Sequence, residues 1–201
     1  MTATSTMILA SGSQIRAELL RRAGLVFDVI PGRIDEEAVR QSHTADGGTA
    51  LDLADLLAEL KARKVAEKYP NRLVIGADQV LECDGRIFAK ADNIDEAAAQ
   101  IAALSGRTHR LFSAAVVCRD GEPLWRHVGI VRLTMHQLSE QFTAGYLARN
   151  WSSVREAVGC YKIEEEGVRL FSRIEGDFFH ILGLPLIELL TWLRIRGDIT
   201  T

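Results

Sequence analysis

Two long apolar runs that each break at an Asp-Gly pair constrain the fold of this chain more than any other feature. The first, "RLVIGADQVLECDGRIFAK", begins as a strand, turns at Asp84-Gly85 and returns as a second strand. The second, "HRLFSAAVVCRDGEPLWRHVGIVRLTM", makes a long hairpin that turns at Asp120-Gly121. A purely parallel, doubly wound sheet would not contain such hairpins, so the two runs predict a twisted sheet of mixed direction.

Helical patterns alternate with the strands, which places the chain in the α/β class. No repeat or low-complexity linker interrupts the pattern, so we expect residues 1–201 to form one large domain or two small lobes with no separable linker. The spacing of apolar residues predicts helices at 14–23, from about 53 to 69, and at 94–104, 139–148 and 186–196, short strands at 7–10 and 27–31, and a polar loop at 43–49.

Composition limits the partners and the compartment. A net charge of −3 gives the whole molecule no attraction to nucleic acid or to an anionic membrane, so an anionic ligand needs a local cluster of basic groups. The first residues carry no basic segment of a signal peptide, and no apolar run approaches the roughly 20 residues that span a bilayer. The three cysteines, Cys83, Cys118 and Cys160, form no CxxC pair. We therefore expect a cytoplasmic protein.

The segment "LASGSQIRAELL" has the order strand, tight turn, helix. Such a turn leaves the first backbone N–H groups of the helix free, which makes it a candidate anion site. The segment is not a Walker loop, because GxxxxGK[ST] is absent and the nearby cation is Arg16. The turn residues Ser11 and Ser13 are therefore candidates for holding a phosphate together with Arg16.

Asp78 is the carboxylate that most suggests chemistry. It ends the apolar run Leu73–Ala77, and open α/β sheets place ligands at the ends of strands. An Asp that merely caps a turn is an equally open interpretation. Glu36, in Asp35-Glu36, is a candidate metal ligand, although taken alone this pair more often begins a helix.

Lysines supply the candidate cations. Lys61 lies beside the apolar stripe of its helix, where it can reach a cleft or can simply extend along the surface. Lys90 ends the strand that returns from Asp84-Gly85, at about the same sheet edge as Asp78 if that hairpin is regular. Acids that hold a divalent metal, together with such cations, would neutralise a polyphosphate.

Other classes of site find less support. The five histidines show no HExxH or other metal-ligand spacing, and His109, His127 and His136 fall in hairpin strands, where packing or exposure is favoured. There is no GxSxG nucleophile elbow, and Cys118 in an apolar strand is typical of a core thiol. The aromatic residues do not alternate with basic ones as they do on single-strand binding surfaces.

The motifs in their order match a known family. The segments "LASGSQIRAELL", "IDE", "LAELKARKVA", "VIGADQV", "IFAK", "LSGRTH" and "EGDFFHILGLPL" follow one another with the right spacing. From about Met7 to Arg194 the chain resembles the Maf-like (septum-formation-inhibitor-like) nucleoside triphosphate pyrophosphatases.

The resemblance implies a two-lobed α/β fold around a central cleft, similar to that of inosine-triphosphate pyrophosphatases, and a homodimer. It also implies hydrolysis of a nucleoside triphosphate to monophosphate and pyrophosphate with Mg²⁺ or Mn²⁺, with Asp78 as the proton acceptor and Glu36 beside it on the metal. A nucleotide-binding regulator of septation without catalysis is the alternative. The resemblance also implies that the phosphates are bound by Ser11, Ser13, Arg16, Lys61 and Lys90.

Departures from the family pattern bear on the substrate. Gln14-Ile15-Arg16 stands where Pro-Arg-Arg is common, Gln79 where Thr is common, and Glu164 where Gln is common. These residues are more similar to the branch that acts on 7-methyl-GTP than to the branch that acts on dTTP and UTP. Gln79 and Glu164 can hydrogen-bond a base edge, and a carboxylate suits a cationic methylated guanine. Ile15 is expected either on the base or sugar or, slightly favoured, in the helix core.

Overall fold

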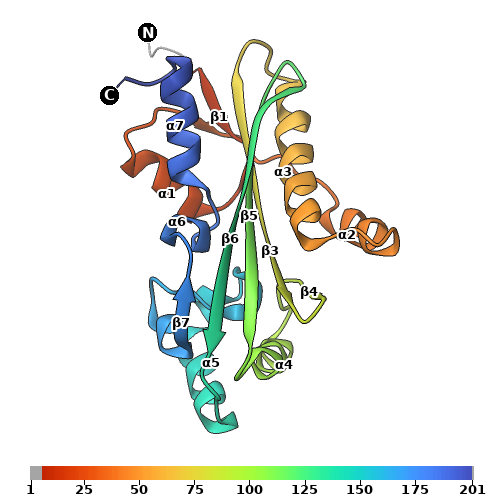
Figure 1. The fold of residues 1–201 in the computed structure, drawn as a ribbon, viewed down its shortest axis with the longest axis vertical. Coiled ribbons are helices and arrows are strands. Elements are labelled where there is room, and N and C mark those ends of the chain that lie inside the picture. Colours follow the sequence, from red (N-terminus) through yellow and green to blue (C-terminus); the bar gives the residue numbers. More distant parts are fainter. Residues whose placement is uncertain (1–5, 201) are drawn as a thin grey trace. The chain divides into compact units, whose positions relative to one another are not determined.

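The protein is described by a computed structural model covering residues 6–200, and within them it is an α/β structure built on one seven-stranded sheet (Figure 1). The strand order is β2-β1-β3-β5-β6-β7, with β4 paired to β3. β1 runs parallel to both β2 and β3. β4 runs antiparallel to β3, and β7 runs antiparallel to β6. The predicted mixed sheet is therefore confirmed. The strands are β1 (Met7–Leu9), β2 (Asp28–Val29), β3 (Leu73–Cys83), β4 (Arg86–Phe88), β5 (Thr108–Arg119), β6 (Glu122–Met135) and β7 (Phe171–Glu175).

Each helix that was predicted from its apolar spacing is present at about the predicted position. The elements that were not predicted lack such a pattern. Beyond its possible start at Asp35-Glu36, α2 was not predicted, and it overlaps the first residues of the expected loop at 43–49, because none of its residues is buried. The strand β7 and the four-residue α6 were also missed, since β7 buries one residue of five and α6 is a single turn. No helix among residues 6–200 is long and apolar enough to cross a membrane. The helices are α1 (Gln14–Arg22), α2 (Glu36–Ala45), α3 (Ala50–Ala66), α4 (Ile94–Leu104), α5 (Glu140–Val154), α6 (Phe178–Ile181) and α7 (Leu186–Arg196), with 3₁₀ turns η1 (Val158–Cys160) and η2 (Glu166–Leu170).

The chain divides into two compact units that share the long strands. Unit 1 comprises residues 6–79, 113–129 and 178–200, and unit 2 comprises residues 80–112 and 130–177. β3, β5 and β6 each contribute residues to both units. The single domain over residues 1–201 and the central cleft stay predictions, and residues 1–5 and 201 lie outside the described part.

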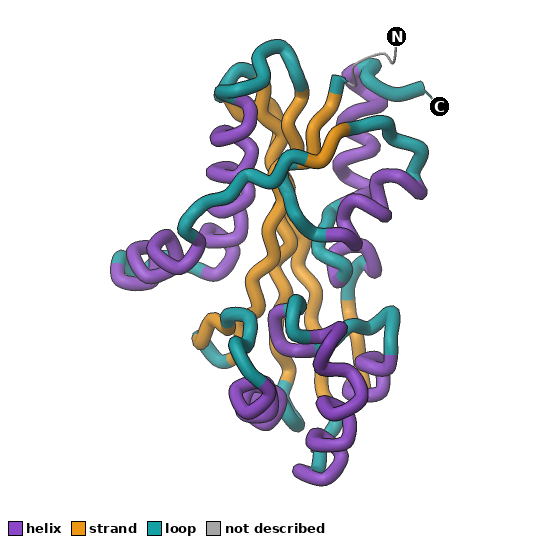
Figure 2. The backbone as a smooth tube through the Cα atoms, turned by 180° about the vertical axis from the view of Figure 1, so that it is seen from behind, coloured by secondary structure: helices purple, strands orange, loops and turns teal. Residues whose placement is uncertain are grey.

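Unit 1 packs helices on both faces of its strands. Leu9 of β1 and Ile75 and Ala77 of β3 share one core cluster with Leu20 of α1 and Leu189 of α7. Figure 1 shows α1 and α7 on one side of these strands and α3 on the other, and Figure 2 shows the same arrangement from behind. Because successive side chains of a strand point to opposite faces, β3 presents residues 73, 75 and 77 to α1 and α7 and residues 74, 76 and 78 to α3.

Unit 2 has its own core, in which one histidine is a packing residue. His109 is fully buried, its Nε2 lies 2.8 Å from the Tyr161 hydroxyl, and its ring packs against Phe171. Burial lowers the pKa of His109 to about 4, so the imidazole is neutral at physiological pH. Of the two expectations for this histidine, packing or exposure, the structure shows packing.

The cysteines are thiols of the interior. Cys83, Cys118 and Cys160 are all buried, and none of them is in a disulfide. Burial raises the pKa of Cys118 and of Cys160 to about 11, which makes both poor nucleophiles at neutral pH. Cys118 is thus a core thiol, as its place in an apolar strand predicts.

Candidate active site

Lys61 lies between two carboxylates from different elements. Its Nζ donates to Asp78 Oδ1 at 3.1 Å and lies 2.8 Å from Glu36 Oε1. Lys61 and Asp78 are each 8% exposed. A lysine that extends along the surface would be far more exposed, so that interpretation of Lys61 was wrong. The structure brings three predicted site residues, from α2, α3 and β3, to one point.

Two glycines allow other parts of the chain to pack closely against α3 on both sides of Lys61. A Cβ atom at Gly76 of β3 would lie 2.1 Å from the carbonyl oxygen of Ala58 and 2.8 Å from the Cβ of Ala62, so α3 can approach β3 only because residue 76 is glycine. On the other side, a Cβ atom at Gly32 would lie 2.4 Å from the carbonyl oxygen of Lys61. Both the strand and the loop before α2 therefore contact α3 next to Lys61.

Asp35 and Glu36 do begin a helix, as the simpler interpretation holds. Asp35 is the N-cap of α2, and its side chain accepts a hydrogen bond from the backbone N–H of Ala38 at 3.0 Å. Glu36 is the first helical residue, and from there its carboxylate also reaches Lys61. The helix start thus presents the second acid of the cluster.

Arg16 is a buried cation beside this cluster. Its Nε donates to the Gly183 carbonyl at 2.7 Å, and its Nη1 donates to the Ala77 carbonyl at 2.9 Å and to Ser11 Oγ at 3.1 Å. Burial lowers the pKa of Arg16, while the charges of Asp78 and Glu36 raise it, and an arginine remains protonated in either case. Because Arg16 holds the carbonyl of the residue before Asp78, it fixes the backbone from which that carboxylate projects.

The Ser-Gly-Ser turn is joined to Arg16. Ser11 is buried at the end of β1, and its Oγ also accepts from the backbone N–H of Ser13 at 3.3 Å. Ser13 is the N-cap of α1 with an extended backbone, and its hydroxyl makes no capping hydrogen bond within the described structure. Ile15 is half-buried and packs on the core of unit 1, which favours its packing role over a nucleotide contact.

Gln79 follows Asp78 but serves the opposite face of β3. Its Nε2 lies 2.9 Å from Ser113 Oγ and 3.0 Å from each of the carbonyl oxygens of His180 and Ile181. The Ser113 hydroxyl in turn donates to the His180 carbonyl at 2.5 Å. Sequence reasoning did not assign Ser113 or α6 to the site, because they lie 34 and more than a hundred residues from Gln79 in the chain and follow no spacing rule.

The remaining predicted site residues, Lys90 and Glu164, belong to unit 2. Both are exposed, Lys90 just after β4 and Glu164 between the two 3₁₀ turns. Their assignments to phosphate and base stay predictions.

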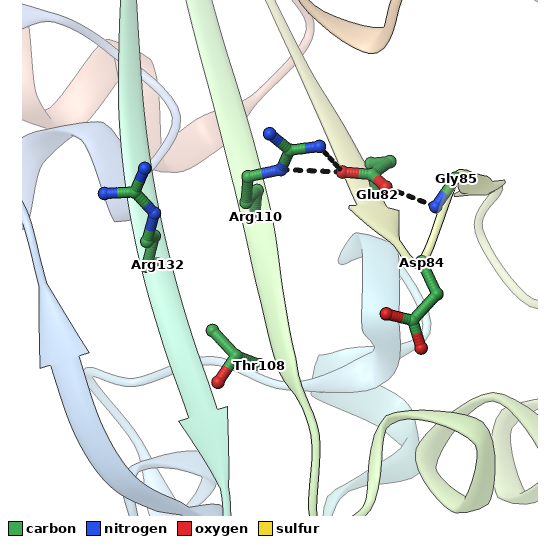
Figure 3. Close-up of a pocket in the computed structure, with 6 residues that line it drawn as sticks. All are labelled: Glu82, Asp84, Gly85, Thr108, Arg110 and Arg132. Carbon is green, nitrogen blue, oxygen red and sulfur yellow. Dashed lines mark hydrogen bonds and ion pairs between the residues drawn. The ribbon is translucent and has the colours of Figure 1, made fainter.

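A pocket of about 390 Å³ in unit 2 contains none of the predicted site residues (Figure 3). Its carboxylate Glu82 is already satisfied, because Arg110 Nε donates to Oε2 at 2.8 Å and the backbone N–H of Gly85 donates to Oε1 at 2.5 Å. We therefore place the candidate chemistry in unit 1. The pocket is lined by Glu82, Asp84, Gly85, Thr108, Arg110 and Arg132.

The donor set around Lys61 fits a hard divalent cation. Glu36 and Asp78 bring carboxylate oxygens to 2.8 and 3.1 Å from one nitrogen, so the two carboxylates converge. Carboxylate oxygens are the protein ligands that Mg²⁺ and Mn²⁺ prefer. Lys61 and Arg16 add two cations, which gives the cluster the means to neutralise phosphate groups as well.

Comparisons with known proteins identify the family of the chain. The family of Maf-like proteins matches residues 6–195 of the chain. A protein of Ruegeria pomeroyi named nucleoside triphosphate pyrophosphatase is 52% identical over 98% of this chain and 100% of its own length. Proteins of the same name from Roseobacter denitrificans and Caulobacter vibrioides are 52% and 46% identical, and each comparison covers at least 96% of both chains. This chain belongs to the Maf-like protein family.

Proposed function

We propose that this protein hydrolyses a nucleoside triphosphate to the monophosphate and pyrophosphate. The observation that carries the proposal is the convergence of Glu36, Lys61 and Asp78, with the buried Arg16 beside them. Relatives about 50% identical over nearly the whole chain bear the name of this activity. Acids together with cations around one point are the chemistry that a polyphosphate substrate requires.

The reaction needs a base, and Asp78 is the residue we assign. A carboxylate beside a bound triphosphate can orient a water molecule towards the α-phosphorus and accept its proton. The oxygen of that water bonds to the α-phosphorus, the bond from the α-phosphorus to the bridging oxygen breaks, and pyrophosphate leaves with the bonding pair. Lys61 and Arg16 share the negative charge that grows on the leaving pyrophosphate.

Glu36 and Asp78 would hold the divalent cation, Mg²⁺ or Mn²⁺, which neutralises phosphate charge when bound. Lys61 occupies the space between these carboxylates, 2.8 and 3.1 Å from their oxygens. A cation between the same carboxylates requires the ammonium of Lys61 to turn away, towards the phosphates. Lys61 therefore has two partners, the acids before substrate binds and the phosphates afterwards.

We also propose 7-methyl-GTP as the preferred substrate. Nε2 of Gln79 is committed to Ser113 and to two carbonyls of α6, so its Oε1 is the atom that would accept from a donor group of the base. The exposed carboxylate of Glu164 suits the positive charge of a methylated guanine. The homodimer that the resemblance implies stays a prediction.

A nucleotide panel tests the activity and the substrate together. We expect release of pyrophosphate, not orthophosphate, and faster turnover of 7-methyl-GTP than of UTP, dTTP or CTP. Asp78→Asn is expected to abolish turnover while nucleotide binding persists, because the amide keeps the shape but cannot accept the proton. Asp120→Asn is the matched control: Asp120 lies in a hairpin turn at φ 53°, which Asn tolerates, and its Oδ1 accepts from the backbone N–H of Asn71, which an Asn oxygen also does.

The outcomes separate the possible functions. Products of diphosphate and orthophosphate would overturn the assignment of the cleaved bond. Full activity of Asp78→Asn would remove Asp78 as the base. Tight nucleotide binding without turnover in the wild-type protein would favour the regulator without catalysis, and faster turnover of UTP or dTTP would overturn the 7-methyl-GTP proposal alone.

A further inference from the structure

Two imidazoles and a carboxylate meet in unit 1, on side chains to which the proposed activity gives no role. His180 Nε2 lies 3.2 Å from Glu188 Oε2, and His127 Nε2 lies 3.7 Å from Glu188 Oε1. The candidate ligand atoms of all three residues lie within 4.8 Å of one another. The residues come from β6, α6 and the first turn of α7, so the cluster joins three elements of one unit.

The surroundings of the cluster leave room for the imidazole of His180. A Cβ atom at Gly129 of β6 would lie 2.2 Å from His180 Nδ1, so the ring rests on a strand residue that has no side chain. The side chain of His180 is 9% exposed, whereas those of His127 and Glu188 are 38% and 33% exposed. The ring of His127 stacks on Trp125 with the centroids 6.3 Å apart. The three ligands are thus held in place but open to solvent on one side, which gives an ion a path of entry.

We propose that His127, His180 and Glu188 form a binding site for a transition-metal cation of the Zn²⁺ class. Two imidazole nitrogens and one carboxylate oxygen are a common three-ligand set for zinc, with a water molecule as the fourth ligand. Bonds of about 2.0–2.2 Å around a tetrahedral ion separate its ligand atoms by about 3.3–3.5 Å. His180 and Glu188 are already at that separation, and rotation of the more exposed side chain of His127 closes the remainder.

Glu188 is placed to act as a ligand, because its carboxylate lies between the two imidazoles, with Oε2 3.2 Å from His180 Nε2 and Oε1 3.7 Å from His127 Nε2. The ring of His180 can keep its present orientation when an ion binds, whereas the ring of His127 rotates towards the ion.

The proposed site differs in chemistry from the cluster at Lys61. Glu36 and Asp78 offer only oxygen, which suits Mg²⁺, whereas imidazoles favour Zn²⁺, Ni²⁺ or Cu²⁺. An ion there would link α6 to β6 and α7 and would keep one position open for water. The backbone carbonyl of His180 holds Gln79 and Ser113, so an occupied site also steadies α6 against β3.

Zinc titration of the tag-free protein, stripped of metal and kept in millimolar Mg²⁺, tests the proposal. Calorimetry should give one Zn²⁺ per chain. Free Zn²⁺ a hundredfold above its dissociation constant should raise Tm by about 5–10 °C. The wild-type protein failing to bind Zn²⁺ saturably under these conditions would overturn the proposal.

Variants locate the ion. His127→Gln and Glu188→Gln should each weaken Zn²⁺ binding at least tenfold, because each removes one of three protein ligands. His136→Gln replaces an exposed histidine in unit 2 and should bind as the wild type does. Asp78→Asn should also retain zinc, since it alters only the oxygen cluster. Loss of binding in Asp78→Asn, or its persistence in both His127→Gln and Glu188→Gln, would contradict this location.

Imidazole NMR of the wild-type protein answers the same question without mutation. In ¹⁵N-histidine-labelled protein, one equivalent of Zn²⁺ should shift the Nε2 resonances of two of the five histidines, and His127→Gln assigns one of them. Shifts in neither His127 nor His180 would reject the site even if zinc binds elsewhere.

Discussion

Helix α3 carries two ion-pair clusters that differ in how far their cations are exposed to water. On the side facing β3, Lys61 contacts Asp78 with side chains 10% and 12% exposed. On another side of the same helix, Arg126 of β6 pairs with Asp55 and with Glu59 at 2.7 Å, and its side chain is 45% exposed. Water screens Arg126, whereas the pair of Lys61 and Asp78 is largely shielded from water and only the third member, Glu36, is 44% exposed.

The difference teaches which charges a ligand can use. In the Arg126 cluster Arg63 supplies a second cation beside Glu59, and both arginines are 45% exposed, so the cluster contributes little to folding and binding. In the Lys61 cluster two acids share one ammonium, and Lys61 and Asp78 lie where an unpaired charge is costly. A divalent cation in the place of that ammonium would free Lys61 for a phosphate group, which is why we assign the chemistry to the cluster at Lys61.

Among the variants that test this comparison, we expect Lys61→Met to have the largest effect, a loss of turnover. The variant keeps the length of the side chain but removes the charge that stabilises the leaving pyrophosphate. We expect kcat to fall about 10²–10³-fold, the usual result of removing one group that stabilises developing charge. Steady-state release of pyrophosphate measures the fall.

Lys64→Met is the control for that experiment. Lys64 lies three residues further along α3, is exposed, and donates to the Arg33 carbonyl. The kcat of the Lys64→Met variant should stay within twofold of the wild-type value. Equal losses in the two variants would show that any lysine of α3 contributes to activity through the general field of the protein, and would remove the special role of Lys61.

The second effect is on packing, in Gly76→Ala. The added methyl group would lie 2.1 Å from the Ala58 carbonyl oxygen, so α3 must move away from β3. We expect the free energy of unfolding to drop by about 1–3 kcal/mol, as for other overpacked positions. Activity at a temperature well below Tm should drop as well, because the movement separates Lys61 from Asp78.

Gly145→Ala makes the same chemical change where there is room. Gly145 lies within α5, and the nearest atom to an added methyl group is the flexible end of Arg149 at 3.2 Å. Alanine is the better helix former by about 0.5–1 kcal/mol, so this variant should be as stable as the wild type or more so. A denaturant titration in which both variants lose stability would refute the steric explanation.

The smallest effect should come from Arg126→Gln, which removes both ion pairs of the solvent-exposed cluster. We expect a loss of about 0.5–1 kcal/mol in the free energy of unfolding, reduced further by high salt. Burial acts to raise the pKa of Glu59, but hydrogen bonds from Arg126 and Arg63 outweigh it, and the pKa is lowered. A lowered pKa stabilises the fold above the unfolded value of about 4.3 and loses that contribution as pH falls through the folded value.

Unfolding curves at several pH values check this expectation. The difference between wild type and Arg126→Gln should be full at neutral pH and should shrink below about pH 4, near the unfolded pKa of glutamate. A difference that grows towards acid would show that the pair acts through something other than the ionised Glu59.

How far the sequence predicts this protein depends on how local each signal is. The hairpin turns and the stripes of α1, α4 and α7 lie in contiguous segments, and the structure confirms them. α2 escaped prediction because it buries nothing, and β7 because four of its five residues are exposed. Elements that are stabilised by their surroundings rather than by their own pattern leave little trace in the sequence.

The site shows the same division. The position of Lys61 follows from the apolar stripe of its helix, although only the structure shows that Lys61 is buried between two acids. The prediction that Asp78 ends its strand was wrong, because β3 continues from Leu73 to Cys83 and Asp78 lies in its middle. His127, His180 and Glu188 follow no ligand spacing, since three separate elements supply them. A search for motifs could not find that cluster, because its geometry exists only once β6, α6 and α7 are packed.

The hydrogen bonds of Gln79 have a consequence for attempts to re-engineer this protein. The side chain of Gln79 links β3 to α6 by hydrogen bonds to the carbonyls of His180 and Ile181. Ser113 accepts from Gln79 and donates to the His180 carbonyl. Exchanging Gln79 alone for the residue of a relative with another substrate would remove the side-chain donor of the Ile181 carbonyl and leave the His180 carbonyl with Ser113 alone. Residue 79, residue 113 and the segment 178–183 therefore form one exchangeable module, and a chimaera should transplant them together.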